Sequence, residues 1–412
     1  MAVVVLSAMG SSATNQPIVQ RGTEDRFTGI STVSHSEKQG SLVFVFLEIF
    51  SWEGGIQSYV KDVLAAYLEQ SHPAPADVFL LRDGPDCLNP YDRSPLRFHY
   101  LASASPAVGR ARLLAALLKH LMLQRPSQVV CGHVLLLPLV STLCRWLRLP
   151  CTVMIYGKEV WEPLPEREQK ALRQANWIWA ISRYSRDRAC TANGLDPDKV
   201  FMVPCAVDGD RFSPGLADPA LVEAYGLTNC RVLMTVARLW SGDIYKGVDV
   251  TIRALPAIAA AEPTVKYLVI GRGDDQPRLA ALAEELGVSD RVVFAGFVPT
   301  EALVAHYRLA DAYVMPSQEG FGIVYLEAMA CGLPVLSGDQ DGSADPLQDG
   351  RLGWRVPHRN PDAVAAACIE MLAGYDPRCQ GAWLRQEALA AFGTSALAGH
   401  LERAIARSLV AE

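Results

Sequence analysis

Short, continuous apolar runs recur along the chain, and a helical pattern follows each of them. Runs without polar alternation are typical of strands that are buried on both faces, as in parallel sheets covered by helices. We therefore predict an α/β protein with two doubly wound, Rossmann-like domains facing across a cleft. The first series of strands is predicted at 41–50, 77–81, 128–132, 151–157, 177–182 and 199–205, and the second at 231–239, 267–271, 292–296, 312–316 and 334–338.

The length of the chain agrees with two domains. A chain of 412 residues can bury two cores, because single cores rarely grow beyond about 250 residues. The stretch VDGDRFSPGLADP, rich in Asp, Gly and Pro, separates the two series of apolar runs. The predicted parts are a disordered leader over 1–40, an N-terminal domain over 41–212, a linker over 213–228, a C-terminal domain over 229–385 and a C-terminal helix over 386–412 that packs across the domains.

Composition and charge exclude several classes of protein. Half of the residues are hydrophobic, which excludes a wholly disordered chain. A formal net charge of −6 disfavours a nucleic acid as partner. The ten cysteines show no CxxC pair and no zinc-ligand spacing. The most apolar stretch, at 129–144, is shorter than the roughly 20 residues that a membrane span needs. We expect a reduced, cytoplasmic protein.

The stretch EGFGIVYLEAMACGLP at 319–334 combines a glycine turn with the start of a helix. Gly320 and Gly322 keep side chains out of the turn. The backbone N–H groups of Gly322, Ile323 and Val324 can then point at a bound anion, with the helix dipole behind them. A phosphate or diphosphate group fits this place.

Charged side chains complete the predicted anion site. Glu319 and Glu327 flank the helix start, where their carboxylates can accept hydrogen bonds from hydroxyls on either side of a diphosphate. Arg238 and Lys246, in VARLWSGDIYKG, follow the first strand of the second domain, and ligands of doubly wound sheets bind at the carboxyl ends of strands. This arrangement suits a nucleotide sugar; the alternative is an ordinary loop with a solvated Arg and Lys.

Taken together, these motifs resemble the retaining glycosyltransferases of family 4, which have the GT-B fold. The resemblance extends from about residue 42 to 410 and depends on the order and spacing of several short pieces. They are SWEGGIQSYV and VPCAVDGDRFSP in the first domain, and Arg238, Lys246-Gly247, Gly271-Arg272-Gly273, Phe294 to Val298 and Glu319 to Glu327 in the second.

The resemblance implies roles for the charged residues. Glu319 would hold hydroxyls of the donor sugar, and Glu327 would hold the ribose. Arg238 and Lys246 would stabilise the departing diphosphate, as preorganised charge does at a developing anion. The reaction would retain the anomeric configuration by front-face attack, with the leaving phosphate taking the proton of the acceptor.

The resemblance also implies how the rest of the donor is held. Phe297 and Val298 would lie beside the nucleobase, and Gly54 and Gly55 would form the loop of the acceptor-side, N-terminal domain that faces the diphosphate. The donor would be a UDP- or GDP-linked hexose, and the acceptor a glycan or a lipid-linked glycan. No cofactor and no metal are expected, because Arg238, Lys246 and the helix start already supply positive charge.

Two further residues near the expected cleft are weaker candidates. Where relatives commonly have a histidine before a glycine, this chain has Tyr156-Gly157. Tyrosine, with a reference pKa of about 10, is a poor base at neutral pH, so contact with the sugar or plain packing is the expectation for Tyr156. His133, after another strand, is either a site residue or a structural histidine.

Two Asp-x-Asp triplets are open to a metal-binding interpretation. They are Asp208-Gly-Asp210 and Asp339-Gln-Asp341, and turn chemistry explains both more simply.

Residues 101–150 contain six basic residues and no acidic one. The segment 110–125 reads as an amphipathic helix with Leu114, Leu117, Leu118 and Leu121 on one face. One interpretation is a core-facing helix with a solvated basic side. The other is reversible docking on the anionic inner face of the membrane, where a lipid-linked acceptor would lie.

Four other functions remain to be separated from transfer. They are a nucleotide-sugar epimerase or hydrolase of the same fold, a sugar phosphorylase with pyridoxal phosphate on a lysine, and a non-catalytic nucleotide-sugar-binding protein. A nicotinamide dehydrogenase is disfavoured, because GRGDDQ at 271–276 is not the six-residue glycine fingerprint.

Overall fold

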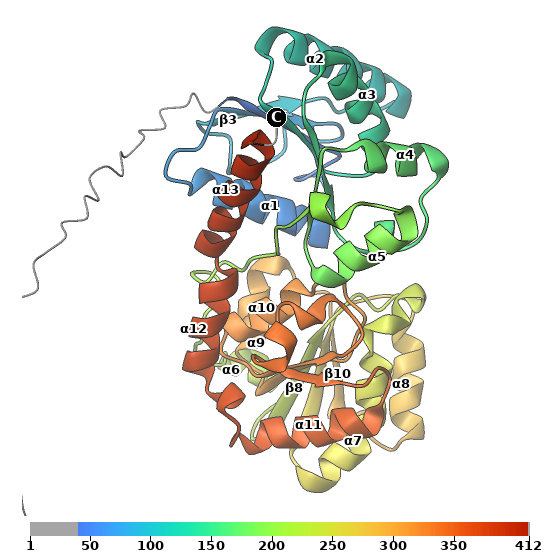
Figure 1. Cartoon of the computed structure of the whole chain (residues 1–412). Helices are drawn as coiled ribbons and strands as arrows, with labels where there is room; N and C mark the ends of the chain where they lie inside the picture. The colour runs from blue at the N-terminus through green and yellow to red at the C-terminus, as the bar shows by residue number, and fades with distance from the viewer. Residues whose placement is uncertain (1–39, 411–412) are drawn as a thin grey trace, which may run out of the picture. The chain divides into compact units, whose positions relative to one another are not determined.

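The computed structural model describes residues 40–410, so the leader predicted over 1–40 lies, except for Gly40, outside the described residues. Two parallel sheets form the framework (Figure 1). The first has the strand order β3-β2-β1-β4-β5-β6-β7 and the second β10-β9-β8-β11-β12-β13. All their paired strands run parallel, as predicted for two doubly wound α/β domains.

The strands coincide with the apolar runs, with two additions. The edge strand β3 and the three-residue β13 were not predicted, because β3 alternates with polar residues and β13 is very short. The strands are β1 (Leu42–Phe46), β2 (Ala76–Leu80), β3 (Leu96–Tyr100), β4 (Gln128–Cys131), β5 (Cys151–Ile155), β6 (Trp177–Ala180), β7 (Val200–Met202), β8 (Arg231–Val236), β9 (Val265–Ile270), β10 (Val292–Gly296), β11 (Ala312–Met315), β12 (Val335–Gly338) and β13 (Trp354–Val356).

Helices cover both faces of each sheet. They are α1 (Gly55–Leu68), α2 (Pro106–Gln124), α3 (Leu137–Leu147), α4 (Glu166–Gln174), α5 (Arg183–Asn193), α6 (Pro219–Ala224), α7 (Val248–Ala261), α8 (Gln276–Glu285), α9 (Leu303–Tyr307), α10 (Ile323–Ala330), α11 (Pro361–Ala373), α12 (Gly381–Phe392) and α13 (Thr394–Val410). Short 3-10 segments occur at η1 (Lys158–Val160), η2 (Pro197–Lys199), η3 (Ser241–Lys246), η4 (Ser289–Arg291), η5 (Thr300–Ala302), η6 (Gly342–Ala344), η7 (Gln348–Gly350) and η8 (Pro377–Cys379).

The alternation of side chains along β1 explains how one strand serves two hydrophobic layers. Val43 and Val45 point into the layer formed with α2 and α3, whereas Phe44 and Phe46 point into the layer shared with α1. All four are buried. Burying each such side chain contributes about 1.5–3 kcal/mol, so a strand of this composition is stable only between two layers of helices.

The segments between and after the sheets differ from the sequence prediction in detail. The predicted linker over 213–228 contains the helix α6. The predicted single helix over 386–412 is two helices, because Gly393 is extended and interrupts it. Helix α12 packs against α10 of the second domain and α13 against α1 of the first (Figure 1). The exact domain boundaries stay predictions.

The basic helix α2 also differs from its prediction. Leu113, Leu117 and Leu121 form its buried stripe, and Leu114 is 42% exposed. Of the four leucines predicted on the apolar face, Leu117 and Leu121 are buried and Leu118 packs against the core, so only Leu114 was wrong; Leu113 takes its place, in the i, i+4 row with Leu117 and Leu121.

Candidate functional site

A cleft of about 1450 Å³ opens at the carboxyl ends of the strands of both sheets. Its lining follows directly after β1 and β5 in the first domain and after β8, β9, β10 and β11 in the second. Ligand pockets usually measure about 300–1,000 Å³, so this cleft has room for two substrates. The predicted site residues that line it are Gly54, Gly55, Tyr156, Arg238, Lys246, Phe297, Val298, Glu319, Gly322, Ile323, Val324 and Glu327.

Two helices begin at the cleft without a capping side chain among the described residues. Helix α10 starts after Gly322, whose φ of 91° lies in the left-handed region that favours glycine. The first N–H groups of a helix have no intrahelical partner, so those at Ile323 and Val324 face the cleft unsatisfied. Helix α1 starts at Gly55 in the same way. Together the two helix starts make one electropositive region of backbone.

A carboxylate and an ammonium group lie in contact beside the start of α10. Lys246, at the end of η3, forms an ion pair with Glu319. Their side chains are 20% and 15% exposed, so the pair is partly shielded from water. The backbone N–H of Glu319 donates to the Asp341 carboxylate at 2.6 Å. Burial raises the pKa of Asp341 to about 6.

Arg238 extends from the end of β8 into the cleft. Its guanidinium contacts the carboxylate of Asp243 at 2.6 Å and lies 5.2 Å from the ring centre of Trp240. Asp243 is buried, whereas the side chain of Arg238 is 65% exposed. The buried acid therefore holds the guanidinium through Nε and Nη2. Within residues 40–410 the remaining nitrogen, Nη1, has no partner and can contact a ligand.

Glu327 lies one turn into α10, away from Glu319. The hydroxyl of Tyr307 donates to its carboxylate at 2.6 Å. Burial raises the pKa of Glu327, and the Tyr307 hydrogen bond opposes this rise. Within residues 40–410 the second carboxylate oxygen makes no hydrogen bond, so it can accept one from a ligand hydroxyl.

Aromatic and glycine residues shape the two ends of the cleft. Phe297 follows β10 and is 54% exposed, and the guanidinium of Arg272 lies 4.7 Å from its ring centre. A flat ring can stack in such a place. At the opposite wall, a Cβ atom on Gly55 would meet no atom of the described residues within 4 Å, so their packing does not require glycine there. That absence of contact is expected if a ligand occupies the space.

Tyr156 and His133 are held by contacts within the first domain. The hydroxyl of Tyr156 donates to the carbonyl of Gly132 at 2.6 Å, and burial raises the pKa of Tyr156 well above its usual value. This geometry favours the packing alternative for Tyr156. His133 does not line the cleft, and its Nδ1 accepts the backbone N–H of Leu135 at 3.1 Å.

The sequence interpretation missed three charged residues at or beside the cleft. Lys158, from the first domain, lies 3.3 Å from the ring centre of Tyr245 in the second. Burial lowers the pKa of Lys158. Asp62, on α1, lines the cleft, and burial followed by the charge of Glu327 raises its pKa. The third residue, Arg272, belongs to the Gly271-Arg272-Gly273 motif. No sequence signal marks Asp62 beyond its position on an amphipathic helix.

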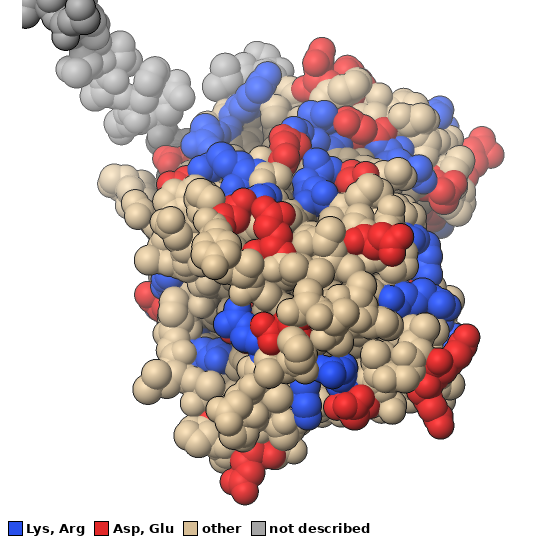
Figure 2. All heavy atoms as spheres, turned by 90° about the horizontal axis from the view of Figure 1, so that it is seen from below, with Lys and Arg blue, Asp and Glu red and all other residues tan. Residues whose placement is uncertain are grey.

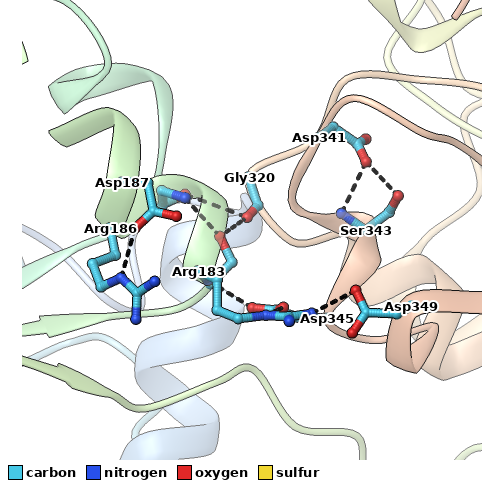
Figure 3. A network of polar contacts seen from close by, with 10 residues as sticks. Arg183, Arg186, Asp187, Gly320, Asp341, Ser343, Asp345 and Asp349 are labelled. Carbon is cyan, nitrogen blue, oxygen red and sulfur yellow. Dashed lines mark hydrogen bonds and ion pairs between the residues drawn. The ribbon is translucent and has the colours of Figure 1, made fainter. Parts of the chain in front are cut away.

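The loop before α10 is anchored to the first domain. The carbonyl of Gly320 accepts hydrogen bonds from the hydroxyls of Ser182 and Ser185, at the start of α5. Arg183 extends from the same helix to the carboxylates of Asp345 and Asp349 (Figure 3). These contacts hold the two walls of the cleft together next to Glu319.

Local turns account for the two Asp-x-Asp triplets. Asp208 accepts the backbone N–H of Asp210 at 2.9 Å. Asp341 accepts that of Ser343 at 2.9 Å, and Figure 3 shows the two side by side. In both triplets, therefore, a carboxylate is used to hold its own loop.

Comparison with known proteins identifies relatives of this arrangement. Residues 230–374 match the family described as glycosyl transferases group 1. A GDP-mannose-dependent alpha-(1-6)-phosphatidylinositol monomannoside mannosyltransferase of Mycolicibacterium smegmatis is 37% identical over 237 residues, which are 54% of this chain. The chain spans 60% of the length of that relative. A GDP-mannose-dependent monoacylated alpha-(1-6)-phosphatidylinositol monomannoside mannosyltransferase of Corynebacterium glutamicum is 28% identical over 77% of this chain and 85% of the relative.

Solved structures agree on the fold. A glycosyltransferase from Rickettsia africae superposes with a TM-score of 0.74 at 16% identity, covering 91% of this chain and 100% of that one. HepE of Anabaena, solved in complex with UDP, superposes with a TM-score of 0.70 at 18% identity, covering 89% of this chain and 100% of that one. The two-domain architecture is therefore GT-B.

Proposed function

We propose that this chain, whose residues 230–374 match the glycosyl transferases group 1 family, transfers a hexose from a nucleotide diphosphate sugar to an acceptor hydroxyl. The observation that carries the proposal is the convergence of two uncapped helix starts, Arg238 and Lys246 in one cleft. Such a concentration of positive charge and backbone donors suits a diphosphate, and the carboxylates of Glu319 and Glu327 suit the sugar groups at its two ends.

GDP-mannose is the proposed donor. Both mannosyltransferase relatives are named as dependent on GDP-mannose. The exposed ring of Phe297 with the Arg272 guanidinium against it provides a stacking place for the guanine base, next to Val298. Glu327, held by Tyr307, would bind the ribose hydroxyls.

The proposed reaction retains the anomeric configuration and uses no basic side chain. The acceptor oxygen attacks the anomeric carbon on the face that the diphosphate leaves, and the carbon–oxygen bond to the phosphate breaks. Lys246 and Arg238 stabilise the negative charge that develops on the phosphate. The proton of the acceptor passes to a phosphate oxygen, which balances the reaction. Tyr156 is unsuited as a base, because its hydroxyl already donates to Gly132 within the protein. No cofactor and no metal are part of this mechanism.

The acceptor is proposed to be a lipid-linked glycan of the phosphatidylinositol mannoside kind, as the names of the relatives suggest. Helices α2 and α3 lie side by side and would meet the surface that carries this lipid (Figure 1). Exposed apolar side chains accompany exposed basic ones on them. The apolar ones are Leu114, Met122, Leu123 and Trp146, and the basic ones are Arg110, Arg112, Lys119, Arg125, Arg145 and Arg148.

Peripheral contact with the inner face of the membrane follows from this surface. Basic residues attract anionic lipid headgroups, and apolar side chains enter the interface. By contrast, the face seen in Figure 2 mixes acidic and basic side chains. Within residues 40–410, no helix is both long enough and apolar enough to cross a bilayer.

Vesicle sedimentation tests the membrane contact. The wild type should sediment with vesicles that contain anionic lipid but not with neutral ones, and less so as salt increases. The triple variant R110E/R112E/K119E should lose this binding, whereas the matched variant R167E/K170E/R253E, on other exposed basic residues, should keep it. Equal binding by both variants would contradict the proposed surface.

Donor binding and product analysis test the transfer itself. Thermal unfolding should shift upward with GDP and GDP-mannose more than with UDP or ADP, and the shift should persist in EDTA. GDP-mannose should then be consumed only when a phosphatidylinositol mannoside acceptor is present. Consumption without acceptor would favour an epimerase or a hydrolase. Binding without consumption, even with acceptor, would favour a binding protein.

A further inference from the structure

A cluster of three potential metal ligands lies in the first domain, outside the cleft. Asp77 is on β2, His99 on β3 and His120 on α2. Their ligand atoms all lie within 4.8 Å of one another, and within residues 40–410 no second group of three His, Cys, Asp or Glu side chains meets this criterion. Asp77 is the second residue of its strand, so the carboxylate lies towards the end of the sheet opposite the cleft.

The distances fit a single small cation. His99 Nε2 lies 2.6 Å from one Asp77 oxygen, and His120 Nε2 lies 3.4 Å from the other. Two ligands bound tetrahedrally to zinc at about 2.0–2.1 Å are about 3.4 Å apart. The His120 separation already has this value, and the His99 separation reaches it with a shift of less than 1 Å.

Neighbouring aromatic contacts fix both imidazole rings. His99 pairs with Phe79 in the register of β2 and β3. Its ring stacks on Phe79 with 4.3 Å between centres, and the ring of His120 contacts the same phenyl group edge-on at 5.3 Å. The two imidazoles are thus held against one phenyl ring, with a nitrogen of each within 3.4 Å of the Asp77 carboxylate.

One of these nitrogens lacks a hydrogen-bond partner among the described residues. Nε2 of His120 is inaccessible to solvent, and its alignment with Asp77 is too poor for a hydrogen bond. Buried polar atoms are rarely left unsatisfied, because each loses its hydrogen bonds to water without gaining others. The side chains of His120 and Asp77 are 13% exposed and that of His99 is 31% exposed, which leaves a path from solvent.

We propose that Asp77, His99 and His120 bind a divalent transition-metal ion of the zinc type. Two imidazole nitrogens and a carboxylate suit this class of ion, and a water molecule would complete a tetrahedral site. The ion would join the edge of the first sheet to α2 as a structural clamp. It takes no part in the proposed transfer, and the site is independent of that proposal.

Metal titration tests the site directly. Full-length protein, stripped with a chelator and passed through gel filtration, is titrated with Zn²⁺ by calorimetry and with Co²⁺ by visible absorption. One equivalent should bind, with the absorption of tetrahedral Co²⁺ and without a cobalt–thiolate band. Binding should also raise the unfolding temperature.

Variants of the ligands decide between this site and adventitious binding. His120→Ala, His99→Ala and the near-isosteric Asp77→Asn should each weaken Zn²⁺ binding at least 100-fold, whereas His72→Ala, an exposed histidine outside the cluster, should leave it unchanged. If a histidine variant fails to fold, Asp77→Asn still provides the test. Wild-type protein that binds no Zn²⁺ saturably, or binding that survives in the folded ligand variants, would overturn the proposal.

Discussion

The ion pair between Lys246 and Glu319 predicts that replacing one residue or the other changes the affinity for GDP in opposite directions. If Lys246 binds the diphosphate, Glu319 competes with it for the ammonium group in the ligand-free cleft. Lys246→Met should therefore weaken GDP binding, and Glu319→Gln should strengthen it. Both variants should lose transfer, because Glu319 is also proposed to hold the donor sugar.

The magnitude follows from the geometry of the pair. Two unit charges about 4 Å apart interact by about 4 kcal/mol at an effective dielectric constant of about 20. The lysine side chain is 20% exposed, so water screens part of this energy. We expect a net loss of about 2.7 kcal/mol for Lys246→Met, or about 100-fold in Kd for GDP. Glu319→Gln should tighten GDP by up to about tenfold, and each should lower kcat/KM for transfer about 10²–10³-fold.

Isothermal titration with GDP measures the first effect, and a transfer assay with GDP-mannose measures the second. The double variant Lys246→Met/Glu319→Gln is the matched control, because it removes both charges and leaves no unpaired carboxylate; its Kd should fall between those of the single variants. The reasoning is refuted if both single variants shift the GDP affinity in the same direction while they remain folded.

Three other substitutions probe two parts of the cleft and the Asp341 carboxylate that supports the Glu319 loop beside it. Glu327→Ala should weaken GDP binding about 10–100-fold in calorimetry, since hydrogen bonds to charged groups are worth about 1.5–3 kcal/mol. Binding of 2′,3′-dideoxy-GDP, which lacks the ribose hydroxyls, should be nearly unaffected. Equal losses of affinity for both ligands would contradict a ribose contact. Gly55→Val should abolish measurable GDP binding while the unfolding temperature stays within about 2 °C, because a Cβ atom there meets no protein atom; full binding would contradict a donor at this wall. Burial raises the pKa of Asp341 to about 6, so between about pH 4 and pH 6 the native state holds a proton that the unfolded chain lacks, and stability falls as pH rises through this window. The unfolding temperature of the wild type minus that of Asp341→Asn should therefore be more positive at pH 4.5 than at pH 7.5. Calorimetry that gives the same difference at both pH values would contradict this.

Much of the fold could be predicted because buried parallel strands leave a strong local signal. Runs such as LVFVF in β1 have no polar alternation and need helices on both faces. The edge strand β3 could not be recognised in the same way, because LRFHY is covered on fewer sides and alternates with polar residues. The single helix predicted over 386–412 is interrupted at Gly393. The interruption depends on α12 and α13 packing against different domains, which no local pattern reports.

The candidate site could be predicted where a single sequence motif supplies both the backbone N–H groups and the charged side chains. The stretch around Glu319 joins a glycine turn, a helix start and two carboxylates within a few residues, and these stay together in the structure. The contacts that fix Lys158 against Tyr245 and Arg183 against Asp345 join residues far apart in the chain. Only the docking of one domain on the other brings such residues together, and no local pattern reports it.

Proton NMR of the reaction as it proceeds tests the central claim most directly. GDP-mannose and a soluble phosphatidylinositol mannoside analogue are mixed with the protein, and the anomeric signals are followed. The account predicts a new α-linked mannose signal that grows in step with GDP and requires the acceptor. A β-linked first product, or free mannose formed equally without acceptor, would contradict it.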